Sequence, residues 1–510
     1  MAAGRTRKDR HVVPRWRSIR RTIEAGEFQN LPQQRPLTEG QRDDLEGLEF
    51  RWSIVGTELA AAEVVGAHLV AGTASESHPA IDLLSRSNNP TYLGLAARIR
   101  DPGQPTEIPG ANLGSASEGF LASKIRDSKR RIAHDVRNPI AWSDLARRYT
   151  ALGHIEQAEK ALTIARGLAP ESRYLLRVSA RFYIHIGKPG AAAQLLRQSA
   201  RTNSDPWLMA TLLSATSLER KPLPGKRVAR RIIDSGRFRP IENSDLVSEM
   251  ATLELKAGGD RAAKKLFVAS LTAPTDNSLA QAEWASHKLT TLEVDPEALQ
   301  VPFRAEALAQ AATQRGQWDL ALAESWAWLD DQPFDASAAI HASYVAAIGK
   351  EDWETSQRAA QVGLRANPND STLANNLAYS LIEMGKPNDA VAALRTARVN
   401  AHERLERVAI SATTGLFEFR SGNPEGGRVL YRDAIELARR SNEAEAEAMA
   451  RAMLAREELR NGFGQQAADL LGALDKLVKR VKDPGVLRCI ERTTDLASAV
   501  DFSAFASDDR

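Results

Sequence analysis

The residue types that most often do chemistry are scattered in this chain. No two of its nine histidines have the spacing of a metal site on one helix, and the motif His-Glu-x-x-His is missing. The only cysteine, Cys489, lies beside Ile490 in a stretch with helical periodicity, where we expect a buried structural thiol rather than a nucleophile. A single cysteine also excludes a disulfide within the chain and favours a reducing compartment.

Phosphate-binding and nucleophile motifs are missing as well. The glycine-rich stretches at 114–119 and 422–427 lack the Gly-Lys-Ser/Thr ending of a phosphate loop. Ser117 follows no strand pattern and is not flanked as in a serine elbow. The sequence therefore predicts no enzyme, no cofactor and no metal.

Charge is distributed unevenly along the 510 residues. Residues 1–250 hold 38 Lys and Arg against 27 Asp and Glu, whereas residues 251–510 hold 30 against 38. The excess is concentrated in residues 160–240, with 16 basic and four acidic side chains. The two halves are thus expected to face partners of different charge.

Neither a membrane span nor a secretory signal is expected. The most apolar stretch, residues 59–74, contains Glu63 and His68 and is shorter than the roughly 20 apolar residues that a spanning helix needs. No apolar core follows the eight Lys and Arg of residues 1–22. The alanine-rich composition, with arginine preferred over lysine, is typical of a bacterial cytoplasmic protein.

The N-terminus carries a basic stretch around one aromatic residue, Arg15-Trp16-Arg17, followed by Arg20 and Arg21. Such a stretch can contact phosphates and stack on a base, and it can equally lie against an acidic protein surface. The alternative is a solvated, partly ordered arm.

Apolar residues after Pro139 repeat with the spacing of helix faces. Gly153 lies where the first helix must turn, and Pro170 ends the second because it lacks an N–H. The apolar positions are Trp142, Leu145, Ala146 and Tyr149 on the first helix, and Ala158, Leu162 and Ala165 on the second.

The same helix pair recurs along the chain. A glycine followed five residues later by alanine marks each copy, and this register predicts about eight or nine units between residues 138 and 482. The pairs are Gly153/Ala158, Gly187/Ala192, Gly258/Ala263, Gly316/Ala321, Gly385/Ala390 and Gly462/Ala467, with Gly422/Gly427 as a weaker relative.

These copies closely resemble the 34-residue tetratricopeptide repeat, most clearly in residues 138–204 and 371–400. Trp142, Leu145, Ala146, Tyr149, Ala158, Leu162, Ala165 and Pro170 occupy the signature positions of that family. The resemblance implies an all-α fold, a right-handed superhelical solenoid of antiparallel helix hairpins.

Composition, together with the glycine and proline residues that interrupt helices, predicts how the rest of the chain is divided. We expect one long helix over residues 38–72 and a shorter one at 92–100. The expected divisions are a basic arm at 1–37, a helical region at 38–100, a linker and start of the array at 101–125, the array at 126–482 with irregular units near 206–240 and 276–300, and a capping helix with an acidic tail at 483–510.

In the family that this chain resembles, ligands contact the inner groove. Transferred by register, the groove positions expected to bind a partner are Arg147, Tyr174, Arg177, Arg181, Asn375 and Tyr379. Guanidinium groups capture carboxylates and phosphates, so an acidic peptide, an acidic protein face and nucleic acid all fit these arginines. The alternative is that the arginines lie on exposed helical faces and only aid solubility. Further basic candidates for an acidic surface or phosphates are Arg15, Trp16, Arg17, Arg20, Arg21, Arg227, Arg230 and Arg231.

The leading hypothesis is a non-catalytic scaffold, adaptor or regulatory subunit that binds a protein or peptide in its groove. One alternative is a nucleic-acid-associated regulator that uses the basic N-terminal half, with affinity falling steeply with salt. The other is a sensor or inhibitory partner of a separately encoded enzyme. The sequence gives neither the partner nor the oligomeric state.

Overall fold

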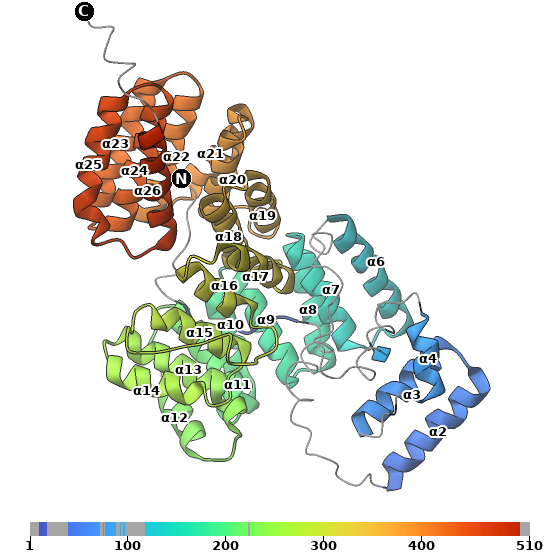
Figure 1. The fold of residues 1–510 in the computed structure, drawn as a ribbon. Coiled ribbons are helices and arrows are strands. Elements are labelled where there is room, and N and C mark those ends of the chain that lie inside the picture. Colours follow the sequence, from blue (N-terminus) through green and yellow to red (C-terminus); the bar gives the residue numbers. More distant parts are fainter. Residues whose placement is uncertain are drawn as a thin grey trace, which may run out of the picture. The chain divides into compact units, whose positions relative to one another are not determined.

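Figure 1 shows the computed structural model, which describes residues 10–17, 39–71, 75, 77–87, 92, 95–96, 118–222 and 225–499. The chain forms two compact units, one of residues 23–114 and one of residues 1–22 together with 115–510. Every regular element in the described ranges is a helix, which confirms the all-α prediction. Of the expected basic arm at 1–37, residues 10–17 are described and lie within the larger unit, and the boundary at residue 37 stays a prediction.

The smaller unit contains α2 (Glu39–Val55), α3 (Glu58–Ala71) and α4 (Pro79–Ser85). The single long helix expected over this region is wrong, because the chain breaks at Gly56, where φ is +57°. A left-handed residue cannot continue an α-helix, and glycine adopts this conformation without strain. The small core of this unit consists of Ala61, Val65, Ala80, Ile81, Leu84 and Ala96. Most of the expected helix at 92–100 and most of the expected linker and start of the array at 101–125 lie outside the described residues.

The larger unit is an array of antiparallel helix hairpins that follows α6 (Glu118–His134). The hairpins are α7 (Pro139–Ala151) with α8 (Ile155–Leu168), α9 (Arg173–His185) with α10 (Pro189–Gln198), α11 (Pro206–Leu218) with α12 (Lys226–Asp234), α13 (Pro240–Lys256) with α14 (Asp260–Ser270), α16 (Ala305–Gln314) with α17 (Trp318–Asp331), α18 (Ala336–Tyr344) with α19 (Trp353–Ala366), α20 (Ser371–Glu383) with α21 (Pro387–Asn400), α22 (Arg404–Arg420) with α23 (Pro424–Arg440), and α24 (Ala444–Arg460) with α25 (Gly464–Val478).

The first hairpin shows why these residues fold in this way. Asn138 caps α7 by accepting the N–H groups of two following residues, and Pro139 takes the first helical position, where no N–H is needed. Gly153 ends α7 with φ of +75°. Ala146 and Ala158 are fully buried, and their small side chains allow the two helices to pack closely. The turn glycines of the later hairpins have positive φ as well, namely Gly187, Gly258, Gly316, Gly385, Gly422 and Gly462.

Two departures from regularity lie where the sequence breaks the pattern. The second helix of the third hairpin, α12, is short and begins after Pro222 and Gly225. Further on, α15 (Asp276–Ser286) has no partner helix of its own, and an irregular segment leads from it to α16. Trp284 of α15 is buried.

A π-helical turn, Val345–Lys350, extends α18. Gly349 in this turn lies against the indole of Trp318, with no room for a Cβ atom. Glu351 then ends the turn in the left-handed region, with φ of 55°. Single π turns occur often at functional sites.

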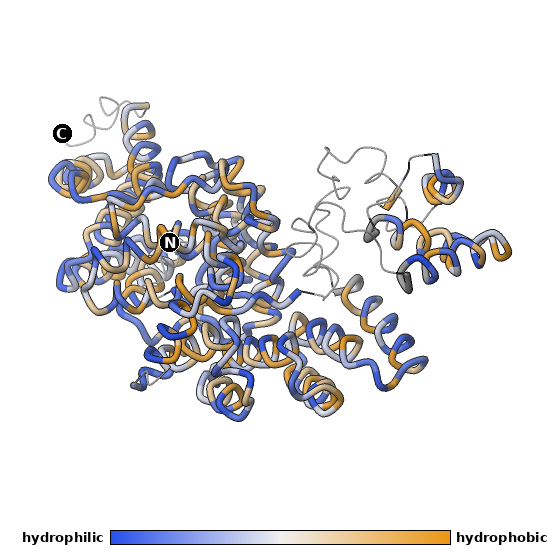
Figure 2. Tube along the Cα trace, turned by 90° about the horizontal axis from the view of Figure 1, so that it is seen from below, coloured by the Kyte–Doolittle hydropathy of each residue, from blue (hydrophilic) through white to orange (hydrophobic). Residues whose placement is uncertain are grey.

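The array ends in α26 (Pro484–Ala499), which packs on α24. Cys489 of α26 is buried, and burial raises the pKa of its thiol. Figure 2 shows hydrophobic and hydrophilic residues alternating along the helices of the array. No helix within the described ranges is long and apolar enough to cross a membrane.

Candidate peptide-binding site

Residues 10–17, here called the N-terminal segment, lie in extended form against the array (Figure 1). The segment has no helix or strand, yet most of its residues are buried. Its partners come from several hairpins. We call them the peptide site: Arg147, Tyr174, Phe182, Ser214, Glu249, Asp276, Asn277, Gln281, Glu306, Asp331, Gln332 and Phe334.

Side chains of the array bind the main chain of the segment along its whole length. The amide groups of Asn277 and Gln281, both on α15, donate to the carbonyls of Val13 and Arg10, each at 2.9 Å. The remaining main-chain bonds are Ser214 Oγ to the Val12 carbonyl, the Val12 N–H to Glu249, the Trp16 N–H to Gln332, Arg147 Nε to the Trp16 carbonyl and the Tyr174 hydroxyl to the Arg17 carbonyl. Amide side chains can donate to and accept from backbone groups, so these contacts do not depend on the side chains of the bound segment.

Trp16 anchors the segment. Its side chain is 0% exposed and lies between Phe182 of α9 and Phe334, which precedes α18. The ring centroids are 6.4 Å and 5.6 Å away with steep interplanar angles, the edge-to-face arrangement that aromatic pairs favour. A fully buried tryptophan packed between aromatic rings is typical of the residues that dominate binding energy.

Two arginines of the segment share one buried carboxylate. Arg10 binds Glu306 of α16 through Nε and Nη2, each at 2.9 Å, and also donates to Gln281. Arg15 pairs with Glu306 as well and reaches Asp276 of α15 at 3.3 Å. Burial raises the pKa of Glu306, but the two guanidinium charges outweigh this effect and hold its pKa well below the ordinary range.

The third arginine, Arg17, joins two carboxylates. Its Nε lies 2.8 Å from both oxygens of Asp331, at the end of α17, and Nη2 lies 2.7 Å from Asp276. Phe303, which has a left-handed φ of 59°, places its ring 4.7 Å from the guanidinium carbon. Burial raises the pKa of Asp331, and Arg17 more than offsets this, so its pKa lies below the ordinary value.

His11 lies between a carboxylate and an ammonium group of the array. Its Nδ1 lies 2.6 Å from Glu249 of α13, and its Nε2 lies 2.6 Å from the ammonium of Lys256 and 3.2 Å from Ser217 Oγ. Because an ammonium only donates, Nε2 accepts and Nδ1 carries the proton toward Glu249. Burial opposes ionisation of Glu249, but His11 and the Val12 N–H lower its pKa.

Of the predicted groove residues, Arg147 and Tyr174 meet Trp16 and Arg17 at the peptide site. Arg177 and Arg181 do not contact the segment through any bond described above. Arg177 donates to Asp245 of α13 at 3.1 Å and lies over the Trp207 ring. Arg181 donates to Asp335 at 3.1 Å and lies over the Phe334 ring.

These contacts bear on the expectation of an acidic partner. Arg177 and Arg181 pair with carboxylates of other hairpins, whereas Arg147 donates to the main-chain carbonyls of Trp16 and Asp331. The side chains that face the segment are mainly acidic or amide groups, and binding of an acidic partner by the three arginines stays a prediction. The carboxylates in contact with it are Glu249, Asp276, Glu306 and Asp331.

The other two predicted groove residues, Asn375 and Tyr379, lie within the C-terminal half of the array and are 1% and 0% exposed. Tyr379 packs on Trp353, and its hydroxyl receives a hydrogen bond from Arg456 of α24. Tyr379 does not line an open groove, because Trp353 of α19 and Arg456 and Met453 of α24 lie against it. Binding of a partner by Asn375 and Tyr379 stays a prediction.

Of the remaining basic candidates, Arg227, Arg230 and Arg231 are exposed on α12. Arg20 and Arg21 lie outside the described residues. Within the part of the chain that the structure describes, Arg15, Trp16 and Arg17 of this group lie in the peptide site and the three arginines of α12 do not.

In the smaller unit, two histidines that are ten residues apart in sequence meet one carboxylate. Nε2 of His68 lies 2.6 Å from Glu49, and Nε2 of His78 lies 3.0 Å from the same oxygen. Nδ1 of His78 accepts the Ala80 N–H, so its proton is on Nε2 and points to Glu49. These hydrogen bonds satisfy the cluster without a cation, and the expectation of no metal site stays a prediction.

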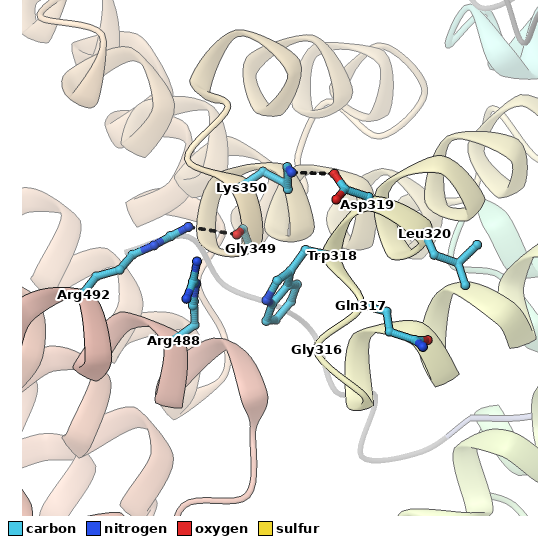
Figure 3. A pocket seen from close by; sticks show the side chains of 9 residues that line it. All are labelled: Gly316, Gln317, Trp318, Asp319, Leu320, Gly349, Lys350, Arg488 and Arg492. Atoms are coloured by element: carbon cyan, nitrogen blue, oxygen red, sulfur yellow. Dashed lines mark hydrogen bonds and ion pairs between the residues drawn. The ribbon is translucent and has the colours of Figure 1, made fainter. Parts of the chain in front are cut away.

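A cavity of about 660 Å³ lies beside α17 and α26. Figure 3 shows the side chains that line it. Its cationic side chains already have acceptors within the chain. Lys350 pairs with Asp319 at 2.5 Å, Arg492 donates to the carbonyl of Gly349 at 2.9 Å, and Arg488 pairs with Glu491 at 2.7 Å. The peptide site is the stronger candidate, because it holds a recognised segment.

Sequence reasoning missed the acidic side of the peptide site. Its residues come from α13, α15, α16 and α17, and no local motif marks them. The net negative charge of residues 251–510 was the available signal, because a basic N-terminus and an acidic C-terminal half can pair.

No family model and no curated protein matches this chain. Among solved structures, it is similar to yeast Tom70, at 13% identity over 78% of this chain and 96% of that chain, with a TM-score of 0.27. It is also similar to the APC/C hetero-tetramer Cut9-Hcn1, at 12% identity over 92% of each chain, with a TM-score of 0.32. Such values add no argument about function, so the fold rests on the helices themselves and membership of the tetratricopeptide repeat family stays a prediction.

Proposed function

We propose that this protein is a non-catalytic interaction scaffold that binds an extended peptide at the peptide site. The observation that carries the proposal is the N-terminal segment itself, which occupies the site through seven hydrogen bonds to its main chain. Main-chain bonds give affinity for any extended chain, and side-chain pockets give specificity.

The arrangement of the helices supports this role. The first helices of successive hairpins present side chains to one strand of peptide, which is how stacked helical repeats bind extended ligands. The roles of adaptor and of regulatory subunit both fit such a site, and a cytoplasmic bacterial location stays a prediction from composition.

A peptide library tests the proposal without assuming the ligand. Random 12-residue peptides would be selected against the full chain in which Arg15, Trp16 and Arg17 are replaced with alanine, so that the segment no longer competes strongly. We expect selected peptides to lose affinity when Asn277→Ala and Gln281→Ala remove the donors to the peptide backbone.

The matched control is Arg227→Glu on α12, which should leave the affinity unchanged. Peptides whose binding ignores the α15 substitutions, or failure to select any peptide by a folded chain, would contradict the proposed function. Binding of duplex DNA that falls steeply with salt and is abolished by Arg227→Glu would instead support the nucleic-acid alternative.

A further inference from the structure

We infer that the ligand of the peptide site is a basic peptide in which two arginines flank a tryptophan, and that residues 10–17 compete with this ligand for the same site. The inference rests on the proposed function and deepens it. It replaces the acidic partner expected from the sequence by one of opposite charge.

The site recognises four side chains in a fixed order. Glu306 and Gln281 bind the arginine at position 10, and the aromatic pocket binds the tryptophan six residues later. Asp276 and Asp331 bind the arginines on either side of that tryptophan. Arginine suits these carboxylates because its planar guanidinium binds two oxygens at once.

An acidic ligand is disfavoured by the same contacts. Asp276, Glu306 and Asp331 are largely buried, and a buried carboxylate without a cation is costly. A peptide with glutamates at these positions, or a phosphate backbone, would bring like charges together in the same space. Discrimination should therefore follow the sign of the charge as well as the shape of the indole.

Competition follows from how the segment is held. Its contacts outside itself are made to side chains of the array, and the backbone hydrogen bond found within its described residues is local, from the Val13 N–H to the His11 carbonyl. The segment therefore contacts the array in the way that a separate peptide would, and it forms no part of a helix hairpin. An external peptide that makes the same contacts must displace it, and its apparent affinity falls by the fraction of sites that are free.

The experiment uses a fluorescent synthetic peptide with the sequence of residues 8–19 and the full chain in two forms. In the release variant, Arg15, Trp16 and Arg17 are alanine; the native chain is the comparison. By fluorescence anisotropy we expect saturable binding to the release variant and affinity for the native chain weaker by at least about tenfold. Replacing the tryptophan of the peptide with alanine should weaken its binding to the release variant by about 30-fold or more.

A charge-reversed peptide, with glutamate at the three arginine positions, tests the ligand class. Equal or tighter binding of this peptide to the release variant would overturn the inference and leave the proposed function in place. Equal binding of the basic peptide to the native and release chains would overturn the competition. If the release variant bound neither these two peptides nor any library peptide, the proposed function itself would fail.

Circular dichroism and gel filtration check that the release variant is folded. If it is not, Arg10→Ala offers a milder release, because it removes one cation and keeps Trp16. The expected result is then an intermediate affinity for the basic peptide, and an affinity equal to that of the native chain would count against competition.

Discussion

Release of the N-terminal segment by Trp16→Ala can be measured directly. Truncating a fully buried tryptophan costs about 3–5 kcal/mol. Trp16 is 0% exposed and contacts two aromatic rings, so we expect about 4 kcal/mol, which corresponds to a roughly thousandfold larger released population. The released population stops increasing once the segment is mostly free, so the measured change cannot exceed the free energy with which the native segment docks.

Trypsin provides the assay, since it cleaves after arginine and Arg10 and Arg17 are buried in the docked state. When opening is fast relative to cleavage, the cleavage rate follows the open population. Mass spectrometry of fragments ending at Arg17 should show slow cleavage in the native chain. In the variant, the rate should approach that of a free peptide of the same sequence.

Val13→Ala is the matched control, because this side chain is only partly buried and the Val13 carbonyl still accepts from Asn277. It should change the rate by less than about fivefold. Cleavage after Arg17 within threefold of native in Trp16→Ala, with the helices intact, would refute the view that Trp16 anchors the segment.

Two further predictions concern the array. Burial lowers the pKa of His185 to about 4, with Arg181 adding to the effect, and burial lowers that of His341 to about 4. The unfolded chain therefore takes up protons below about pH 6.5 while the folded chain does not, so the melting temperature should fall from pH 7 to pH 4; His341→Gln should reduce the slope, and a flat profile would contradict the assignment. Gly349→Ala should destabilise the array by about 1–3 kcal/mol because its Cβ meets the Trp318 ring, whereas Gly472→Ala on α25, with open space around it, should be neutral or stabilising in urea unfolding; equal effects would count against the packing argument.

Local signals were sufficient to predict the hairpins. Turn glycines such as Gly153 and Gly385 combine positive φ with a fixed distance to a buried alanine, and both requirements act within one unit. The break at Gly56 was missed because an apolar stripe continues across it. An isolated glycine within a helical pattern does not show by itself whether the helix ends there.

The candidate site depended on contacts between distant residues. Register predicted Tyr379 as a groove residue, but which helices cover it is decided by how the array curves, which no single repeat encodes. Arg15 and Arg17 were singled out as basic, but their carboxylate partners lie 259 to 314 residues away in sequence. The opposite net charges of the two halves are compatible with such a pairing, but they do not identify the partners.

The guanidinium of Arg147 links parts of the chain that are far apart in sequence. It donates to the carbonyl of Trp16, 131 residues before it, and to the carbonyl of Asp331, 184 residues after it. In stacked repeats, each unit contacts only its neighbours. The N-terminal segment adds contacts between units that are not neighbours, because it bonds to α9, α13, α15 and α17. A peptide that took its place would supply these cross-links instead, and the distances between these helices would then depend on the length and contacts of that peptide.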